Sequence, residues 1–187
     1  MKICGVTSPG DARCAEEAGA DAVGIVVFSD SPRSVAVERA GEILDRLGPF
    51  TTGVCVTATE DGEEIDEMLA LRTPAVQVRA EIPLPRTRAR VLRMISPGQR
   101  PAYPCDAVVI DSSRGRGQPF DRGFARQVLA NCPLPAILAG GLTPENANAA
   151  AALCPYALDV ASGVESRPGV KDPRLVRAFI SACRRLP

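Results

Sequence analysis

Ala22-Val23-Gly24-Ile25-Val26-Val27-Phe28 is the stretch of this sequence that decides the fold. It is a short and almost entirely apolar run, as expected of a strand that is covered on both faces in a parallel sheet. A helical pattern that Gly19 ends comes before it, and a second helical pattern over Ala36–Leu47 follows it. A buried strand between two helices predicts an α/β fold with parallel crossovers.

The same alternation continues along the whole chain. The expected strands are Lys2–Cys4, Ala22–Phe28, Thr51–Thr57, Ala75–Val78, Val91–Ile95, Ala107–Asp111, Ala136–Ala139 and Ala157–Val160. The expected helices are about Pro9 or Asp11 to Ala18, Ala36–Leu47, Glu63–Leu71, Phe120–Ala130, Pro144–Ala152 and Asp172–Arg184. The segments Glu81–Arg90 and Ser96–Asp106 contain prolines and no helical apolar stripe. We therefore predict a (β/α)8 TIM barrel whose fourth and fifth helices are reduced to loops.

The main alternative is an open, doubly wound sheet. No GxGxxG motif follows the first strand, which makes this alternative less favourable. The chain of 187 residues suits one core, so we expect residues 1–187 to form a single barrel domain. Losing two covering helices would account for a length below that usual for the barrel. The loss would also expose strands near Val76 and Val91–Ile95, unless nearby prolines and arginines or a partner chain cover them.

Composition limits the partners and the chemistry. The 22 basic and 22 acidic residues balance, so we expect no nucleic-acid partner. No apolar run has the length of a membrane span and the first residues do not form a signal peptide, so we expect a cytoplasmic protein that binds no membrane. Seven cysteines without a CxxC motif argue against a disulfide framework and a zinc site. Because histidine is absent, proton transfer must use Cys, Asp, Glu, Lys or Tyr.

Polar residues follow the predicted strands, whose C-terminal ends meet at one mouth in such a barrel. Cys4 ends the first strand and is either a buried core cysteine or, if its pKa falls, a base or nucleophile. Arg33, after the second strand, is either a surface arginine or a bidentate holder of a carboxylate. Asp121 follows Ser112–Gly117, a stretch that could close over a ligand. The Asp121 carboxyl could be a general acid, a helix N-cap, or both.

Two glycine-bearing segments suit a phosphate group. Gly140-Gly141 follows the seventh predicted strand, and Ser162-Gly163 follows the eighth. Many barrels bind phosphate at these two positions through backbone N–H groups, which glycine lets approach the anion closely. Asp159, late in the eighth strand, could accept hydrogen bonds from sugar hydroxyls or pair with a basic residue inside the barrel.

These motifs together resemble those of the phosphoribosylanthranilate isomerase family, (β/α)8 enzymes of tryptophan biosynthesis. The resemblance covers most of the chain except about Ala80 to Asp106. The strings that carry it are Lys2-Ile3-Cys4-Gly5-Val6-Thr7, Ala18-Gly19-Ala20-Asp21-Ala22-Val23-Gly24, Ser31-Pro32-Arg33, Ala75-Val76-Gln77-Val78, Phe120-Asp121, Ala139-Gly140-Gly141-Leu142-Thr143-Pro144-Glu145-Asn146, Asp159-Val160-Ala161-Ser162-Gly163-Val164-Glu165 and Pro168-Gly169-Val170-Lys171-Asp172.

The resemblance implies an Amadori rearrangement of N-(5-phosphoribosyl)anthranilate to 1-(2-carboxyphenylamino)-1-deoxyribulose 5-phosphate. It implies that Cys4 takes the C2 proton as general base and that Asp121 protonates the ring oxygen as general acid. No metal and no cofactor would be needed, and the partner would be the phosphosugar substrate. The substrate-binding residues that it implies are Arg33 for the anthranilate carboxylate, with Gln77, Gly140, Gly141, Asp159, Ser162 and Gly163.

The chain also departs from the family pattern. Gln77-Val78 is followed by Arg79-Ala80 where the family usually continues with His-Gly, and Arg122 follows Asp121 where Trp is frequent. Two alternatives therefore stay open: a related aminoaldose-phosphate isomerase of histidine biosynthesis, whose substrate carries two phosphates, and a non-catalytic phosphosugar-binding barrel. We expect a monomer.

Overall fold

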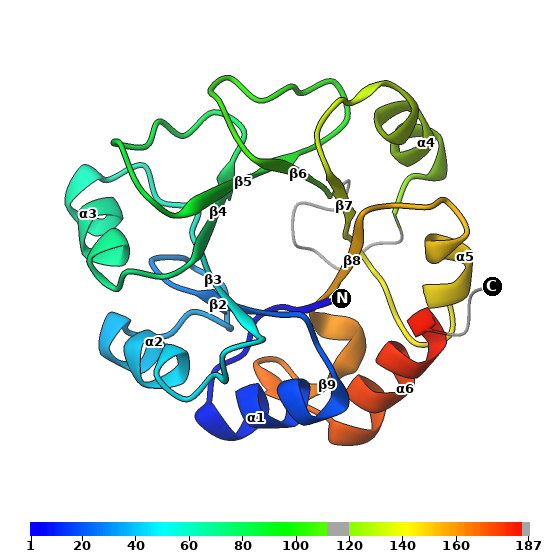
Figure 1. Ribbon diagram of the computed structural model, residues 1–187, viewed down its shortest axis with the longest axis horizontal. Coiled ribbons are helices and arrows are strands. Elements are labelled where there is room, and N and C mark those ends of the chain that lie inside the picture. Colours follow the sequence, from blue (N-terminus) through cyan, green and yellow to red (C-terminus); the bar gives the residue numbers. More distant parts are fainter. Residues whose placement is uncertain (112–119, 185–187) are drawn as a thin grey trace.

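Eight parallel strands close into a barrel in the computed structural model, which describes residues 1–111 and 120–184 (Figure 1). In chain order they are β1 (Lys2–Ile3), β2 (Ala22–Val26), β3 (Thr52–Val56), β4 (Ala75–Arg79), β5 (Arg90–Ile95), β6 (Ala107–Ile110), β7 (Ala136–Leu138) and β8 (Ala157–Val160). Each strand pairs with the next, and β8 closes the ring by pairing with β1 through Asp159 and Lys2. The predicted (β/α)8 barrel is confirmed.

Helices form a broken ring outside the barrel (Figure 1). They are α1 (Pro9–Ala18), α2 (Val37–Leu44), α3 (Gly62–Ala70), α4 (Arg122–Asn131), α5 (Ala147–Ala151) and α6 (Pro173–Arg184). The connections 80–89 and 96–106, both described in full, contain no helix and appear in green between α3 and α4 (Figure 1). The predicted reduction of the fourth and fifth helices is therefore confirmed. Along residues 1–111 and 120–184, every helix falls short of what a membrane span requires.

Three elements were absent from the sequence prediction, and many element boundaries differ from it by one to three residues. After β8 the chain forms a short 3-10 helix, η1 (Ser162–Val164), and an antiparallel hairpin of β9 (Glu165–Arg167) and β10 (Val170–Lys171). Strands this short leave no periodic pattern in the sequence. The helix α5 begins at Ala147, after the expected start at Pro144, because the Asn146 side chain bonds the backbone of Thr143 and Gly141 and holds this segment as a turn.

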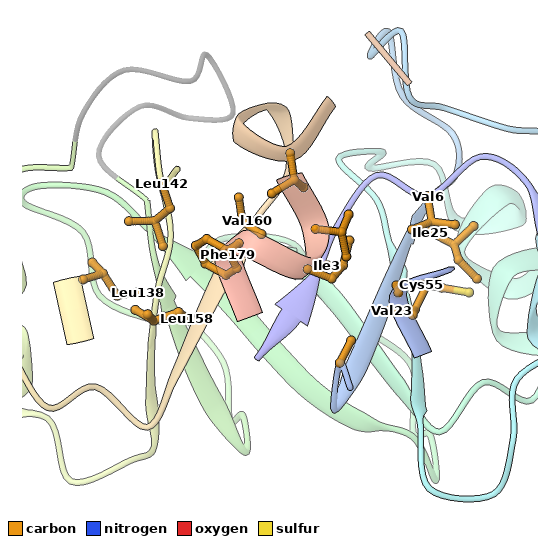
Figure 2. Close-up of a cluster of buried hydrophobic side chains, with 14 of the residues drawn as sticks. Ile3, Val6, Val23, Ile25, Cys55, Leu138, Leu142, Leu158, Val160 and Phe179 are labelled. Carbon is orange, nitrogen blue, oxygen red and sulfur yellow. The ribbon is translucent and has the colours of Figure 1, made fainter. Parts of the chain in front are cut away.

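Alternate residues of each strand face opposite sides of the barrel wall. In β6, Val108 and Ile110 pack outward against the helices, whereas Ala107 and Val109 belong to a smaller cluster inside the barrel. Figure 2 shows the outer layer around β1, β2, β7 and β8, with Phe179 of α6 near its centre. This alternation also decides which polar residues can reach the barrel interior.

The two helix-free connections still cover the barrel wall. Arg93 on β5 is 2% exposed, and its Nη1 donates to the carbonyl oxygens of Ile82 (2.6 Å) and Arg79 (3.2 Å). Its Nε donates to the carbonyl of Pro104 (3.4 Å), and the Tyr103 ring lies 5.2 Å from its guanidinium carbon. One arginine therefore ties both connections to the strand that they cover.

Of the alternatives left open for these strands, cover by a nearby arginine and its loops is the one that the structure shows. Val76 and Ile95 are 0% and 4% exposed, and Val78 packs with Ile65 of α3 and Ile82 of the first connection. The apolar residues of the loops, together with Arg93, replace the missing helices.

Candidate active site

A cavity of about 400 Å³ opens at the C-terminal ends of the barrel strands. Residues at or just after the ends of all eight strands line it. The predicted site residues among them are Cys4, Arg33, Gln77, Gly140, Gly141, Asp159 and Ser162. The fold therefore brings together side chains that lie more than 150 residues apart in the sequence, as a barrel mouth does.

Cys4 follows β1 at the rim of this cavity. Its N–H donates to the carbonyl of Val160 (2.8 Å), which continues the pairing between β1 and β8. Gly24 on β2 makes room for it, because a Cβ at that position would lie 2.7 Å from the Cys4 sulfur. Burial raises the pKa of the Cys4 thiol, and the nearby Lys2 ammonium opposes this shift only in part. The thiol pKa is thus above its usual value, contrary to the lowering that a reactive cysteine usually shows.

A buried polar cluster surrounds Lys2, which lies on β1 two residues before Cys4. The Lys2 ammonium donates to Gln77 Oε1 (2.9 Å) and to Asp159 Oδ2 (2.7 Å), and all three side chains are nearly inaccessible. Burial disfavours the Lys2 ammonium, but Asp159 outweighs this effect and the pKa of Lys2 lies above its usual range. Within the described ranges, Asp159 Oδ1 is buried without a hydrogen-bond partner. Asp159 thus pairs with a basic residue and still presents one acceptor at the cavity.

Arg33 lines the cavity and forms an ion pair with the buried carboxylate of Glu165. Its Nε and Nη2 donate to the two oxygens of Glu165, each at 2.8 Å, and Lys171 donates to Glu165 Oε1 at 2.8 Å. Burial disfavours the Glu165 carboxylate, but these two cations more than compensate, so the pKa of Glu165 is lowered. Glu165 occupies one edge of the Arg33 guanidinium, so a substrate carboxylate would have to use the other edge.

Arg79, at the end of β4, also lines the cavity. Its Nη2 donates to Glu60 (2.6 Å), and its Nε lies 3.3 Å from a carboxylate oxygen of Glu81. Two carboxylates thus neutralise the Arg79 guanidinium, whereas Arg33 has one carboxylate partner. Arg79 is therefore a poorer binding group for an anion than Arg33.

The glycine segments after β7 and β8 lie against each other. Gly140 and Gly141 have φ values of 93° and 58°, in the left-handed region that glycine adopts without strain. A Cβ on Gly163 would lie 1.9 Å from the carbonyl oxygen of Leu142, so only glycine permits this contact. Asn146 accepts a hydrogen bond from the N–H of Thr143 and donates one to the carbonyl of Gly141, each at 2.8 Å. Gly163 itself is not among the cavity-lining residues, and it packs against the backbone of Leu142 and Thr143.

The general-acid role of Asp121 stays a prediction, because this residue comes just after residues 112–119, which lie outside the described part of the chain. Asp121 is exposed and is the N-cap of α4, where its Oδ1 accepts from the N–H groups of Gly123 (2.8 Å) and Phe124 (3.0 Å). It does not line the cavity that the described residues enclose. The N-cap alternative therefore has structural support. The stretch 112–117, which we expected to close over a ligand, lies outside the described residues.

A different aspartate lines the cavity. Asp111 directly follows β6, is 6% exposed, and is held by a hydrogen bond from its N–H to the carbonyl of Ile95 (3.1 Å). In the closed barrel order, β6 is separated from β1 only by β7 and β8, so Asp111 and Cys4 stand on either side of the two glycine segments. Sequence reasoning treated Asp111 as the last residue of a strand. The available signal was that it ends an apolar run, as Cys4 does.

A family model for N-(5'-phosphoribosyl)anthranilate (PRA) isomerase matches residues 1–182. The chain belongs to this family. It is 46% identical to the N-(5'-phosphoribosyl)anthranilate isomerase of Methanoregula boonei, over 98% of this chain and 96% of the relative. It is 40% identical to the enzyme of the same name from Pseudomonas fluorescens, over 98% of this chain and 97% of the relative.

Solved structures of the family superpose on the whole chain. The phosphoribosylanthranilate isomerase of Thermus thermophilus matches with a TM-score of 0.85 and 36% identity, over 97% of this chain and 96% of that one. A family structure in complex with reduced 1-(o-carboxyphenylamino)-1-deoxyribulose 5-phosphate matches with a TM-score of 0.78 and 28% identity, over 99% and 98% of the two chains. The predicted family resemblance is therefore confirmed.

Proposed function

We propose that this protein catalyses the isomerisation of N-(5'-phosphoribosyl)anthranilate in tryptophan biosynthesis, with Cys4 as general base and Asp121 as general acid. Family membership supports the reaction. The observation that carries the base role is that Cys4 lines the cavity from β1, beside the glycine segments of β7 and β8. Asp121 follows β6, on the other side of those segments in the barrel order, and the family resemblance supports its role as acid. A sugar phosphate anchored at those glycines would have one proposed group on each side.

The reaction needs one proton donor and one proton acceptor. As the C1–O bond of the furanose breaks, the lone pair of the anthranilate nitrogen forms an iminium at C1, and Asp121 protonates the departing ring oxygen. The Cys4 thiolate then removes the C2 proton, and the electron pair of the C2–H bond neutralises the iminium to give an enolamine. Tautomerisation of the enolamine, with proton return to C1, gives the ketone.

The remaining cavity residues would fix the substrate at both ends, which supplies the orientation that a two-step proton transfer needs. Backbone N–H groups of Gly140, Gly141 and Ser162 would hold the phosphate. Arg33 would bind the anthranilate carboxylate through the guanidinium edge that Glu165 leaves open. Gln77 and Asp159 Oδ1 would contact sugar hydroxyls at the cavity wall.

Three variants test the catalytic roles through the change in anthranilate fluorescence during turnover. We expect Cys4→Ser and Asp121→Asn each to lower kcat by roughly 100-fold or more, the usual contribution of a positioned acid or base. Asn caps a helix about as well as Asp, so Asp121→Asn should leave stability almost unchanged and test the acid role by itself. Full activity of Asp121→Asn together with an inactive Asp111→Asn would move the acid role to Asp111.

Assays of both substrates in parallel distinguish this function from that of the aminoaldose-phosphate isomerase of histidine biosynthesis. The absence of any turnover would indicate a non-catalytic barrel.

We further propose that residues 1–187 form a single domain that acts as a cytoplasmic monomer. The burial of the β4 and β5 outer face under the loops supports the monomer, since no partner is needed to cover it. Sedimentation at micromolar concentration tests it.

A further inference from the structure

Glu165 lies outside the barrel wall yet contacts two cations of the mouth. It begins the β9–β10 hairpin, and its side chain is only 4% exposed. The carboxylate receives the Nε and Nη2 of Arg33 in a bidentate pair and the Nζ of Lys171 at its Oε1. A buried carboxylate with three charge-assisted hydrogen bonds is held in one position, and it therefore also fixes the positions of the side chains that donate to it.

Of the two cations that Glu165 holds, Arg33 lines the cavity and Lys171 contacts the backbone that leads to Ser162. The aliphatic part of Arg33 crosses Gly5, where a Cβ would lie 2.4 Å from Arg33 Cδ. Lys171 also donates to the carbonyl of Ala161 (3.1 Å), directly before the Ser162-Gly163 segment. Arg33 and Lys171 carry two positive charges and Glu165 carries one negative charge, so the three groups have one net positive charge. The edge of the Arg33 guanidinium that Glu165 leaves open presents this charge to the cavity.

We propose that Glu165 is a positioning residue for substrate recognition, which holds the Arg33 guanidinium so that its open edge faces the anthranilate carboxylate. This inference rests on the proposed function, in which Arg33 binds that carboxylate. A long arginine side chain has many rotamers, and a partner that fixes it beforehand removes much of the entropy cost of binding. Glu165 would thus raise affinity for the carboxylate end of the substrate without touching the substrate.

The test uses two probes that differ only in the carboxylate. One is reduced 1-(o-carboxyphenylamino)-1-deoxyribulose 5-phosphate, and the other is the reduced phenylamino compound without the carboxyl group. Calorimetry gives the affinity of each probe for wild type, Glu165→Gln and Glu165→Asp. We expect Glu165→Gln to bind the carboxylate probe roughly 10-fold more weakly, as when hydrogen bonds to a charged group are lost, and the other probe within about 2-fold. Glu165→Asp should recover part of the loss because it keeps the charge.

The ratio of the two affinities is independent of how much protein is folded, so a destabilised variant still gives an answer. Glu42→Gln, an exposed glutamate on α2 that pairs with Arg39, is the matched control and should leave the ratio unchanged. In an Arg33→Lys background, Glu165→Gln should change the ratio by less than about 2-fold, since the residue through which it acts is gone. In turnover, KM should rise more than kcat falls.

Two results overturn the inference, and they differ from failure of the proposed function. Equal weakening of both probes in Glu165→Gln would mean that Glu165 only supports the loops, and unchanged affinities for both probes would mean that Arg33 needs no partner. If wild type itself does not prefer the carboxylate probe, the role of Arg33 in the proposed function is wrong. If wild type does not turn over N-(5'-phosphoribosyl)anthranilate, the proposed reaction is wrong.

Discussion

Burial raises the pKa of the Cys4 thiol, although Lys2 lies close enough to stabilise the thiolate. The offset is incomplete because the same ammonium also donates to Asp159, whose own negative charge disfavours a thiolate beside it. A thiol with a raised pKa is rarely ionised at neutral pH, but it is a stronger base once it is ionised. The pKa of this thiol is therefore decided by its burial and by the charges of Lys2, Asp159 and Lys171.

A pH profile tests this account at the level of the single residue. Because the Cys4 pKa is above the usual thiol value of 9.0, the thiolate fraction and kcat/KM should keep rising as pH increases through the neutral range. Alkylation of Cys4 by iodoacetamide, located by mass spectrometry, should rise in parallel. The six other cysteines of the chain provide internal controls within each digest. A plateau of both quantities already at about pH 7 would mean that the thiol pKa is lowered in solution.

Asn146 provides a second prediction at this scale. Its two hydrogen bonds hold the turn that contains Gly141, so Asn146→Ala should loosen the proposed phosphate site while leaving Cys4 and Asp111 in place. We expect KM to rise roughly 10-fold, a loss of about 1.4 kcal/mol, with a smaller fall in kcat. Inhibition by inorganic phosphate should weaken by a similar factor. Asn148→Ala, at an exposed position on α5, is the control, and an effect of equal size there would contradict the assignment.

At the scale of elements, Arg93 replaces a helix with hydrogen bonds. A covering helix would satisfy its own backbone and bury an apolar stripe, whereas the loops 80–89 and 96–106 leave carbonyl groups that need donors. Arg93 supplies these donors to both loops from a single strand. The barrel can lose two helices at this point because one buried guanidinium and a few apolar loop residues close the wall.

The stability of Arg93→Met tests this role. The variant keeps much of the volume but leaves several buried carbonyl groups without a donor, so we expect a loss of about 3 kcal/mol in the free energy of unfolding. Arg90→Met is the matched control on the same strand, because Arg90 is exposed and pairs with Asp106 at the surface. Its loss should be below about 1 kcal/mol. Urea unfolding followed by circular dichroism gives both values, and equal values would refute the role.

At the scale of the whole molecule, the first and last parts of the chain meet where the barrel closes. Strand β1 pairs with β8, and α6 packs against α1 and α5 over this seam. Phe179 of α6 is 0% exposed and lies in the same cluster as Ile3 and Val160, one from each of the two closing strands (Figure 2). The seam therefore depends on a helix that is made last in the chain.

Phe179→Ala should for this reason affect the whole barrel. We expect a loss of about 3–5 kcal/mol in unfolding free energy, the usual cost of removing a buried phenyl group. Far-ultraviolet circular dichroism and enzyme activity should be lost at the same urea concentration, because opening the seam removes neighbours from both ends of the sheet. Arg177→Ala, on the exposed face of α6, should change stability by less than about 0.5 kcal/mol. Loss of activity well before loss of structure would argue against a single cooperative unit.

The sequence by itself determined the strands, most of the helices, the two helix-free connections and seven of the residues that line the cavity. These features depend on local periodicity, on proline and glycine positions, and on the rule that barrel strands end at one mouth. Cys4 and the Gly140-Gly141 segment could be predicted because each follows a strand, whereas Gln77 came from the family resemblance.

Only the tertiary structure placed Asp111 in the cavity, because the last residue of an apolar run gives no sign of the side to which it points. Asp111 faces inward by the alternation of β6, and Asp121 accepts from the backbone of its own helix, a role that is compatible with its proposed one as acid. The pairing of Arg33 with Glu165 also joins residues 132 positions apart, and no local pattern records such a contact. Partners of this kind are set by closure of the ring, which a linear pattern does not contain.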